Sequence, residues 1–176
     1  TSIFSVSFDQ AIIIGRILSA LFSLLLIPLL YMLGKQLRDE TTGVIAACLI
    51  ATSIGCIQFA HFATFEMWLT FFTLLLTYYC LCYFQSPSIK HLALLGILLG
   101  ILIGIKISSL VLFFPVFVLL CFTYFAKKVS MLRRLFSTTI AFCFVMLLAG
   151  FSYAVTNPFA VMDMRAFIAS MQYEGG

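Results

Sequence analysis

The chain has 176 residues, of which 64% are hydrophobic and only 9% are charged, and its mean hydropathy is +1.19. These values exclude an ordinary soluble domain, which is about half apolar and about one quarter charged. The net charge of +4 is not gathered in a basic stripe, so no nucleic-acid partner is predicted. The composition predicts a multi-pass integral membrane protein whose partner is the lipid bilayer.

Apolar runs of about 20 residues mark helices that cross a bilayer, because backbone groups in lipid must be satisfied within their own segment. About six such spans are predicted, which gives an all-α, polytopic transmembrane helical bundle forming one domain over residues 1–176. The spans lie near residues 11–34, 42–59, 65–84, 89–105, 109–126 and 135–156. The chain begins without Met and ends after a polar stretch, which we interpret as an internal piece of a longer protein.

The fourth predicted span carries a glycine at every fourth position, at Gly96, Gly100 and Gly104. This spacing places the three glycines on one face of a helix, where a second backbone can approach closely. Two interpretations stay open at this point: a close helix–helix contact, and the general tolerance of membrane helices for glycine.

Positive charges divide unevenly between the two sets of alternate loops. One set contains seven Lys and Arg residues and the other contains three, which places the first set in the cytoplasm. The first set is Lys35, Arg38, Lys90, Lys127, Lys128, Arg133 and Arg134, and the second is Arg16, Lys106 and Arg165. Both ends of the chain are then predicted on the external or lumenal side.

The same topology gathers polar residues from five different connections at the external side: Arg16, His61, Glu66, Lys106 and Asp163. A carboxylate at a membrane edge is costly unless it is paired or functional. Arg16 has two interpretations, because its long side chain could reach the interface or bind an anionic group such as a phosphate. His61 and Glu66 are not a convincing metal site, since no second His or Cys lies near them.

Four stretches resemble the GT-C glycosyltransferases of the protein O-mannosyltransferase and aminoarabinose-transferase group. Gly15-Arg16-Ile17-Leu18-Ser19-Ala20-Leu21 with Leu30-Tyr31-Met32-Leu33-Gly34 matches one helix of the group, and His61–Glu66 with Leu69-x-Phe71-Phe72 occupies the place of a second motif. Gly96-x3-Gly100-x3-Gly104-x-Lys106 and Asn157–Asp163 with Phe167 and Tyr173–Gly176 resemble two later elements. His61 stands where an Arg is usual in the group, and Glu66 stands where an Asp is usual.

The resemblance implies an integral membrane glycosyltransferase that moves a sugar from a polyprenyl-phosphate carrier to a lipid, glycan or protein acceptor on the external face. It implies that Arg16 and Lys106 bind the donor phosphate and that Glu66 positions the acceptor or a divalent metal ion. His61 and Asp163 are further candidates. In this group the general base lies upstream of the helix that contains Arg16, and Asp9 is too close to that helix to take the role. The base is therefore expected before Thr1, and the chain by itself is expected to be inactive.

Two alternatives remain open from the sequence. A secondary transporter would also carry charged residues in its membrane helices, but transporters place them near the midplane. In this chain the charges lie at span ends on one side, which favours an active site at the membrane interface. The second alternative, a membrane subunit without catalytic activity, does not explain why the charges converge.

Overall fold

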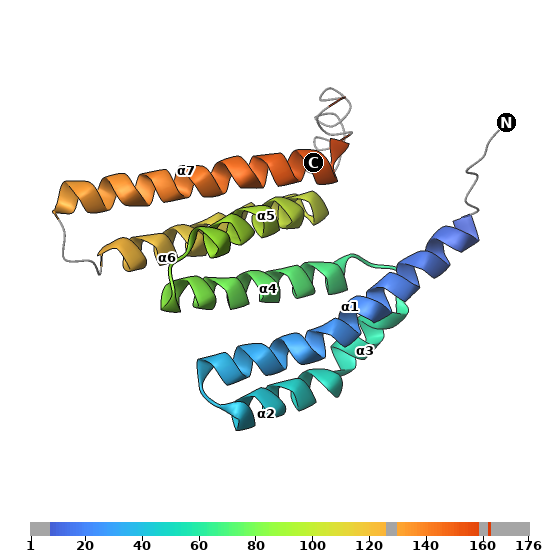
Figure 1. Cartoon of the computed structure of the whole chain (residues 1–176). Coiled ribbons are helices and arrows are strands. Elements are labelled where there is room, and N and C mark those ends of the chain that lie inside the picture. The colour runs from blue at the N-terminus through green and yellow to red at the C-terminus, as the bar shows by residue number, and fades with distance from the viewer. Residues whose placement is uncertain (1–7, 126–129, 159–161, 163–176) are drawn as a thin grey trace. The chain divides into compact units, whose positions relative to one another are not determined.

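The computed structural model describes residues 8–125, 130–158 and 162, and all of its regular elements are helical (Figure 1). The helices run in the order α1 (Phe8–Leu37), α2 (Glu40–Ala51), α3 (Ile54–His61), α4 (Glu66–Gln85), α5 (Ile89–Ile105), the 3-10 helix η1 (Ile107–Leu112), α6 (Phe113–Phe125) and α7 (Met131–Thr156). The predicted all-α, polytopic fold class is confirmed. The chain divides into two compact units, Thr1–Tyr78 and Tyr79–Gly176.

The predicted number of six spans is wrong. Within the described residues, four helices are long and apolar enough to cross a membrane, or up to five if the bent pair α2 and α3 forms one span. The predicted second span is broken, because α2 and α3 meet at an angle of 50°. The fourth predicted span, α5, has 17 residues and is counted only as a shorter apolar helix.

The break between α2 and α3 has a local cause in the residues that follow Ala51. The hydroxyl of Thr52 donates to the carbonyl oxygen of Cys48 at 2.9 Å, and Ser53 is extended, with φ −67° and ψ 115°. Hydroxyl side chains that bond to nearby backbone groups compete with helix propagation, and Gly55 in the next turn is a weak helix former. A run of hydrophobic residues therefore does not continue as one straight helix here.

In the first unit, α1 and α2 form a tightly packed antiparallel hairpin. A Cβ atom added at Gly34 would lie 2.8 Å from the Cα atom of Gly43, so the two backbones meet without side chains between them. Lys35 and Glu40 form an ion pair across the turn. Asp39 caps α2 by accepting from the Thr42 hydroxyl at 2.6 Å and the Thr42 backbone N–H at 2.7 Å, which lowers the pKa of Asp39.

In the second unit, the glycine face of α5 packs directly on α7, so of the two interpretations of the glycine spacing that the sequence left open, the structure shows the close helix–helix contact. A Cβ atom added at Gly100 would lie 2.3 Å from the carbonyl oxygen of Ala149, and one at Gly96 would lie 2.9 Å from that of Val145. Beside them, the hydroxyl of Ser152 donates to the carbonyl oxygen of Ile97 at 3.0 Å. Small residues thus let a hydrogen bond form between the two helices.

The outer surfaces of the helices remain strongly apolar, as lipid contact requires. Large hydrophobic side chains are exposed on the described parts of both units, for example Ile17 at 63% and Leu147 at 73%. In water these surfaces would cause aggregation, whereas in a bilayer they face lipid chains at no such cost. The exposure pattern and the long apolar helices establish a multi-pass membrane protein.

Candidate functional site

The predicted site residues are divided between the two compact units. Arg16, His61 and Glu66 belong to the first unit, and Lys106 belongs to the second. Asp163 lies outside the described residues. The geometry that follows is therefore that of the first unit, with Lys106 described separately.

Arg16 lies in the ninth position of α1, because this helix begins at Phe8 and is longer than the predicted span. Its side chain is exposed, and within the described residues it has no hydrogen-bond or ion-pair partner. The apolar part of α1, Asp9–Leu37, has 29 residues and is about 43 Å long, whereas the hydrocarbon layer is about 30 Å thick. The helix exceeds this thickness by about 13 Å, a little over two turns, so Arg16 can lie at the edge of the layer.

The connection between α3 and α4 packs against the N-terminal half of α1, on both sides of Arg16 along the sequence. A Cβ atom added at Gly15 would lie 2.8 Å from the Cβ atom of Ala63. The buried hydroxyl of Ser19 donates to the carbonyl oxygen of Thr64 at 3.0 Å. These contacts bring the segment that contains His61 and Glu66 to the part of α1 that contains Arg16.

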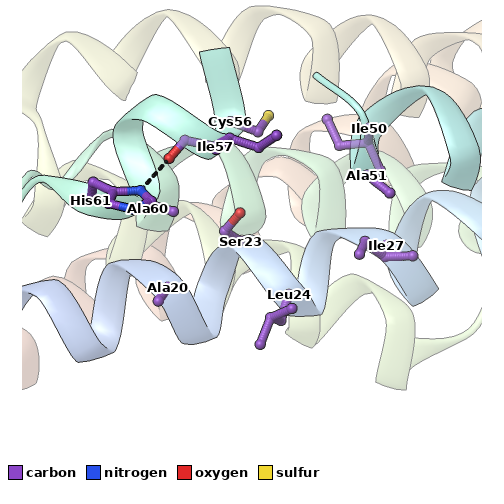
Figure 2. A pocket seen from close by; sticks show the side chains of 10 residues that line it. All are labelled: Ala20, Ser23, Leu24, Ile27, Ile50, Ala51, Cys56, Ile57, Ala60 and His61. Carbon is purple, nitrogen blue, oxygen red and sulfur yellow. Dashed lines mark hydrogen bonds between the residues drawn. The ribbon is translucent and has the colours of Figure 1, made fainter. Parts of the chain in front are cut away.

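His61 and Glu66 occupy the facing ends of two helices rather than two positions on one helix. His61 is the last residue of α3, and its Nδ1 atom is 2.9 Å from the carbonyl oxygen of Ile57 (Figure 2). Glu66 is half-buried and is the first residue of α4, where a carboxylate interacts favourably with the helix dipole. Among the described residues there is no group of three or more His, Cys, Asp or Glu side chains that could hold a metal ion.

The start of α4 is fixed on α1 by aromatic rings. The ring of Phe22 lies 5.9 Å from that of Trp68, 5.2 Å from that of Phe71 and 5.7 Å from that of Phe72, measured between centroids. Such tilted pairs add to the apolar area that the rings bury. This cluster holds Glu66, which lies two residues before Trp68, in a defined position relative to α1.

A pocket of about 280 Å³ opens between α1, α2 and α3, next to this region (Figure 2). Its walls are mostly aliphatic, with three polar or polarisable side chains, Ser23, Cys56 and His61. The lining residues are Ala20, Ser23, Leu24, Ile27, Ile50, Ala51, Cys56, Ile57, Ala60 and His61. The pocket exists because the bend between α2 and α3 turns α3 away from the direction of α2.

Two buried polar atoms near the α3–α4 connection have no hydrogen-bond partner in the described part of the chain. They are the hydroxyl oxygen of Thr64 and the indole nitrogen of Trp68. A polar atom that is buried without a partner costs free energy, so a partner such as a water molecule or a ligand is expected there. Neither residue was singled out as a site candidate from the sequence, although Thr64 lies within the His61–Glu66 stretch that resembles a family motif.

Lys106 directly follows α5 and ends it. Its backbone is extended, with φ −151° and ψ 122°, and its N–H donates to the carbonyl oxygen of Leu102 at 2.9 Å. Its side chain is exposed, and η1 begins at the next residue. The prediction that Lys106 lies at the end of a helix agrees with this placement, while its role stays a prediction.

One comparison with known proteins found a match. Residues 1–152 match the model of a protein family described as dolichyl-phosphate-mannose-protein mannosyltransferase. This match covers both the Arg16 helix and the glycine face of α5. The comparisons with curated proteins and with solved structures found no match.

Proposed function

The chain belongs to the dolichyl-phosphate-mannose-protein mannosyltransferase family, a family of GT-C membrane glycosyltransferases, and we propose on this premise that it uses a polyprenyl-phosphate-linked sugar as donor. The acceptor is a lipid, glycan or protein on the external or lumenal side of the membrane. Arg16 and Lys106 bind the donor phosphate, and Glu66 positions the acceptor or a divalent metal ion. His61 and Asp163 are further candidates for contact with the substrates.

The proposed reaction is a direct displacement at the anomeric carbon of the sugar. A carboxylate accepts the proton of the acceptor hydroxyl, the hydroxyl oxygen forms a bond to the anomeric carbon, and the bond from that carbon to the phosphate oxygen breaks. The polyprenyl phosphate leaves with the electron pair of the broken bond. Cationic side chains stabilise the negative charge that develops on the phosphate, which is commonly the largest contribution to catalysis in such sites.

The observation that carries this proposal is the placement of Arg16. It is an exposed guanidinium without a partner among the described residues, and it lies in the part of α1 against which the Glu66 segment packs. A guanidinium matches the geometry of a phosphate with two parallel hydrogen bonds. A cation and a carboxylate held in one region of the first unit suit a charged donor and a hydroxyl acceptor.

Transfer by the full-length protein in detergent tests the donor class. The purified protein is expected to release polyprenyl phosphate and glycosylate an acceptor when it is given a polyprenyl-phosphate sugar, and to transfer nothing from a nucleotide sugar. Reconstituted protein that carries a solute across the bilayer without forming a glycosidic bond would contradict the proposal.

Glu66→Gln separates the proposed role of Glu66 from donor binding. The substitution keeps the shape of the side chain and removes its charge. We therefore expect the KM for the acceptor to rise roughly tenfold, because about one charge-assisted hydrogen bond is lost. The KM for the donor is expected to change less than twofold. Glu40→Gln, at the exposed first residue of α2, is the matched control and should behave as wild type. Equal changes in both KM values would assign Glu66 to the donor instead.

Cysteine labelling tests the proposed orientation, in which the loops at 35–41, 85–91 and 127–134 are cytoplasmic; this orientation requires the 17-residue helix α5 to cross the membrane as well as α6. In a Cys-free background, Ser130→Cys should be closed to an impermeant external reagent, because it lies in the set of loops that is rich in Lys and Arg. Ser108→Cys, in η1 after Lys106, should be labelled from outside. Labelling of Ser130→Cys from outside would reverse the orientation. Labelling of both positions from one side would show that α6 does not cross the membrane between them as proposed.

A further inference from the structure

The pocket between α1, α2 and α3 is aligned with Arg16 along α1. Successive residues of an α-helix are rotated by about 100° and rise by about 1.5 Å. Relative to Arg16, the lining residues Ala20, Ser23 and Ile27 are therefore rotated by only about 40°, −20° and 20°. Arg16 and the α1 wall of the pocket thus lie on one face of the helix.

The order of chemical groups along this face is complementary to a lipid with an anionic head group. The cation lies at one end, and the apolar lining extends from about 6 Å to about 16 Å further along α1, from Ala20 to Ile27. The Cα–Cβ bond of Arg16 tilts toward the N-terminus of α1, away from the pocket, which directs the guanidinium toward the membrane edge. A head group at Arg16 and a chain in the pocket would both fit this geometry.

The walls of the pocket favour a hydrocarbon chain as the occupant. On the α3 side they are Cys56, Ile57, Ala60 and the ring of His61, and Figure 2 shows α3 beside the part of α1 that contains Ala20 and Ser23. The Nδ1 atom of His61 is already 2.9 Å from the carbonyl oxygen of Ile57. Small and aliphatic side chains with few polar groups recognise an apolar chain and offer little to a sugar.

We infer that this pocket binds the first part of the polyprenyl chain of the donor, next to the phosphate that Arg16 binds. This inference rests on the proposed function for the identity of the head group, and it adds the location of the chain. Arg16, about one helical turn before the first lining residue Ala20, supplies the charge complementarity that a neutral lipid would not use. The bend between α2 and α3 is then a functional feature, because it opens the space beside α1.

Cys56 provides a direct test, because it is the cysteine among the lining residues. In a full-length variant in which every other cysteine is replaced by Ala, a small membrane-permeant thiol reagent should modify Cys56 about tenfold more slowly when long-chain polyprenyl phosphate is present. Polyprenol of the same length and inorganic phosphate, added separately, should protect much less. Arg16→Gln should reduce the protection by polyprenyl phosphate to the level seen with polyprenol.

A matched control uses Cys48 as the single cysteine, since Cys48 is exposed on α2 and does not line the pocket. Its modification rate should not depend on polyprenyl phosphate. Equal protection of Cys48 and Cys56 would overturn the inference, because it would indicate a general effect of the lipid. Equal protection of Cys56 by polyprenol and by polyprenyl phosphate would also overturn it, since the phosphate would then have no part in binding.

A kinetic test distinguishes failure of this inference from failure of the proposed function. Ala20→Phe places a ring in the pocket. The preference in kcat/KM for a long-chain donor over a short-chain donor should then fall roughly tenfold, because the ring excludes about two methylene groups of the chain from the pocket. Leu49→Phe, at an exposed position on α2 outside the pocket, should keep the wild-type preference. Wild-type preference in Ala20→Phe would reject the pocket while the transferase function stands.

Discussion

Gly100→Ala is expected to destabilise the second unit strongly, because the added methyl group has no space. Its Cβ atom would lie 2.3 Å from the carbonyl oxygen of Ala149, 2.6 Å from the Cβ atom of Ser152 and 2.9 Å from the backbone nitrogen of Tyr153. Two of these three atoms belong to the backbone of α7, so α5 and α7 must separate. Overpacking of this kind costs roughly 3 kcal/mol, which is about a hundredfold in the ratio of folded to unfolded protein.

The measurement is the thermal or denaturant unfolding of the protein in detergent, together with the yield of monodisperse protein. Gly150→Ala is the matched control, because a Cβ atom there has nothing within 4 Å. Replacing this helical glycine should leave the stability unchanged or raise it by roughly 0.5–1 kcal/mol, since Ala favours the helix more than Gly does. Equal stability of the two variants would show that α5 and α7 are not packed backbone to backbone.

Arg16→Lys is expected to lower donor-dependent turnover by roughly ten- to a hundredfold. Lysine keeps the charge and most of the length but cannot form the two parallel hydrogen bonds of a guanidinium to a phosphate. Losing one charge-assisted hydrogen bond costs roughly 1.5–3 kcal/mol, and about 1.4 kcal/mol corresponds to a factor of ten in rate. Expression and membrane insertion should not change, because the charge is the same. The measurement is transfer activity against donor concentration, with protein level determined in parallel.

Arg38→Lys is the control for this substitution, since Arg38 is exposed in the turn after α1 and its Nε atom lies 3.9 Å from a carboxylate oxygen of Asp39. It should show wild-type turnover. If Arg16 only reaches the interface with its long side chain, Arg16→Lys will be as active as wild type, and Arg16 is then removed from the donor site.

A double-mutant cycle with Arg16→Gln and Lys106→Gln tests whether both cations bind one phosphate, in which case their effects on turnover will not add.

The helical character of the chain could be predicted from its sequence because it follows from composition and length of apolar runs alone. The glycine contact of α5 could also be predicted, since Gly96, Gly100 and Gly104 share one face in any α-helix. The number of spans could not be predicted correctly. Thr52 and Ser53 interrupt an apolar run, and only their backbone conformation shows that the run becomes two helices at 50°.

The candidate site was predicted as a set of residue types, without the contacts that place them. Charge in an apolar sequence singled out Arg16, His61, Glu66 and Lys106 before any geometry was known. The pocket residues were not singled out, although Ala20, Ser23 and Ile27 follow Arg16 at helical spacing, because apolar and small residues at this spacing are common in membrane helices. Cys56 and Ile57 could not have been added, since their place beside α1 depends on the bend before α3.

The sequence by itself determined that this is a multi-pass helical membrane protein of the GT-C glycosyltransferase type, because hydropathy and motif spacing are properties of the linear chain. The tertiary structure alone decided which surfaces meet. It packs the α3–α4 connection against Gly15 and Ser19, and it opens a pocket on the face of α1 that contains Arg16. The physical reason is that a side chain's neighbours across helices depend on where each helix breaks and how closely two backbones approach. The close approach is a matter of packing between distant residues, as the contact of Gly100 with Ala149 shows, whereas the bend after Ala51 depends on the local backbone conformation at Thr52 and Ser53.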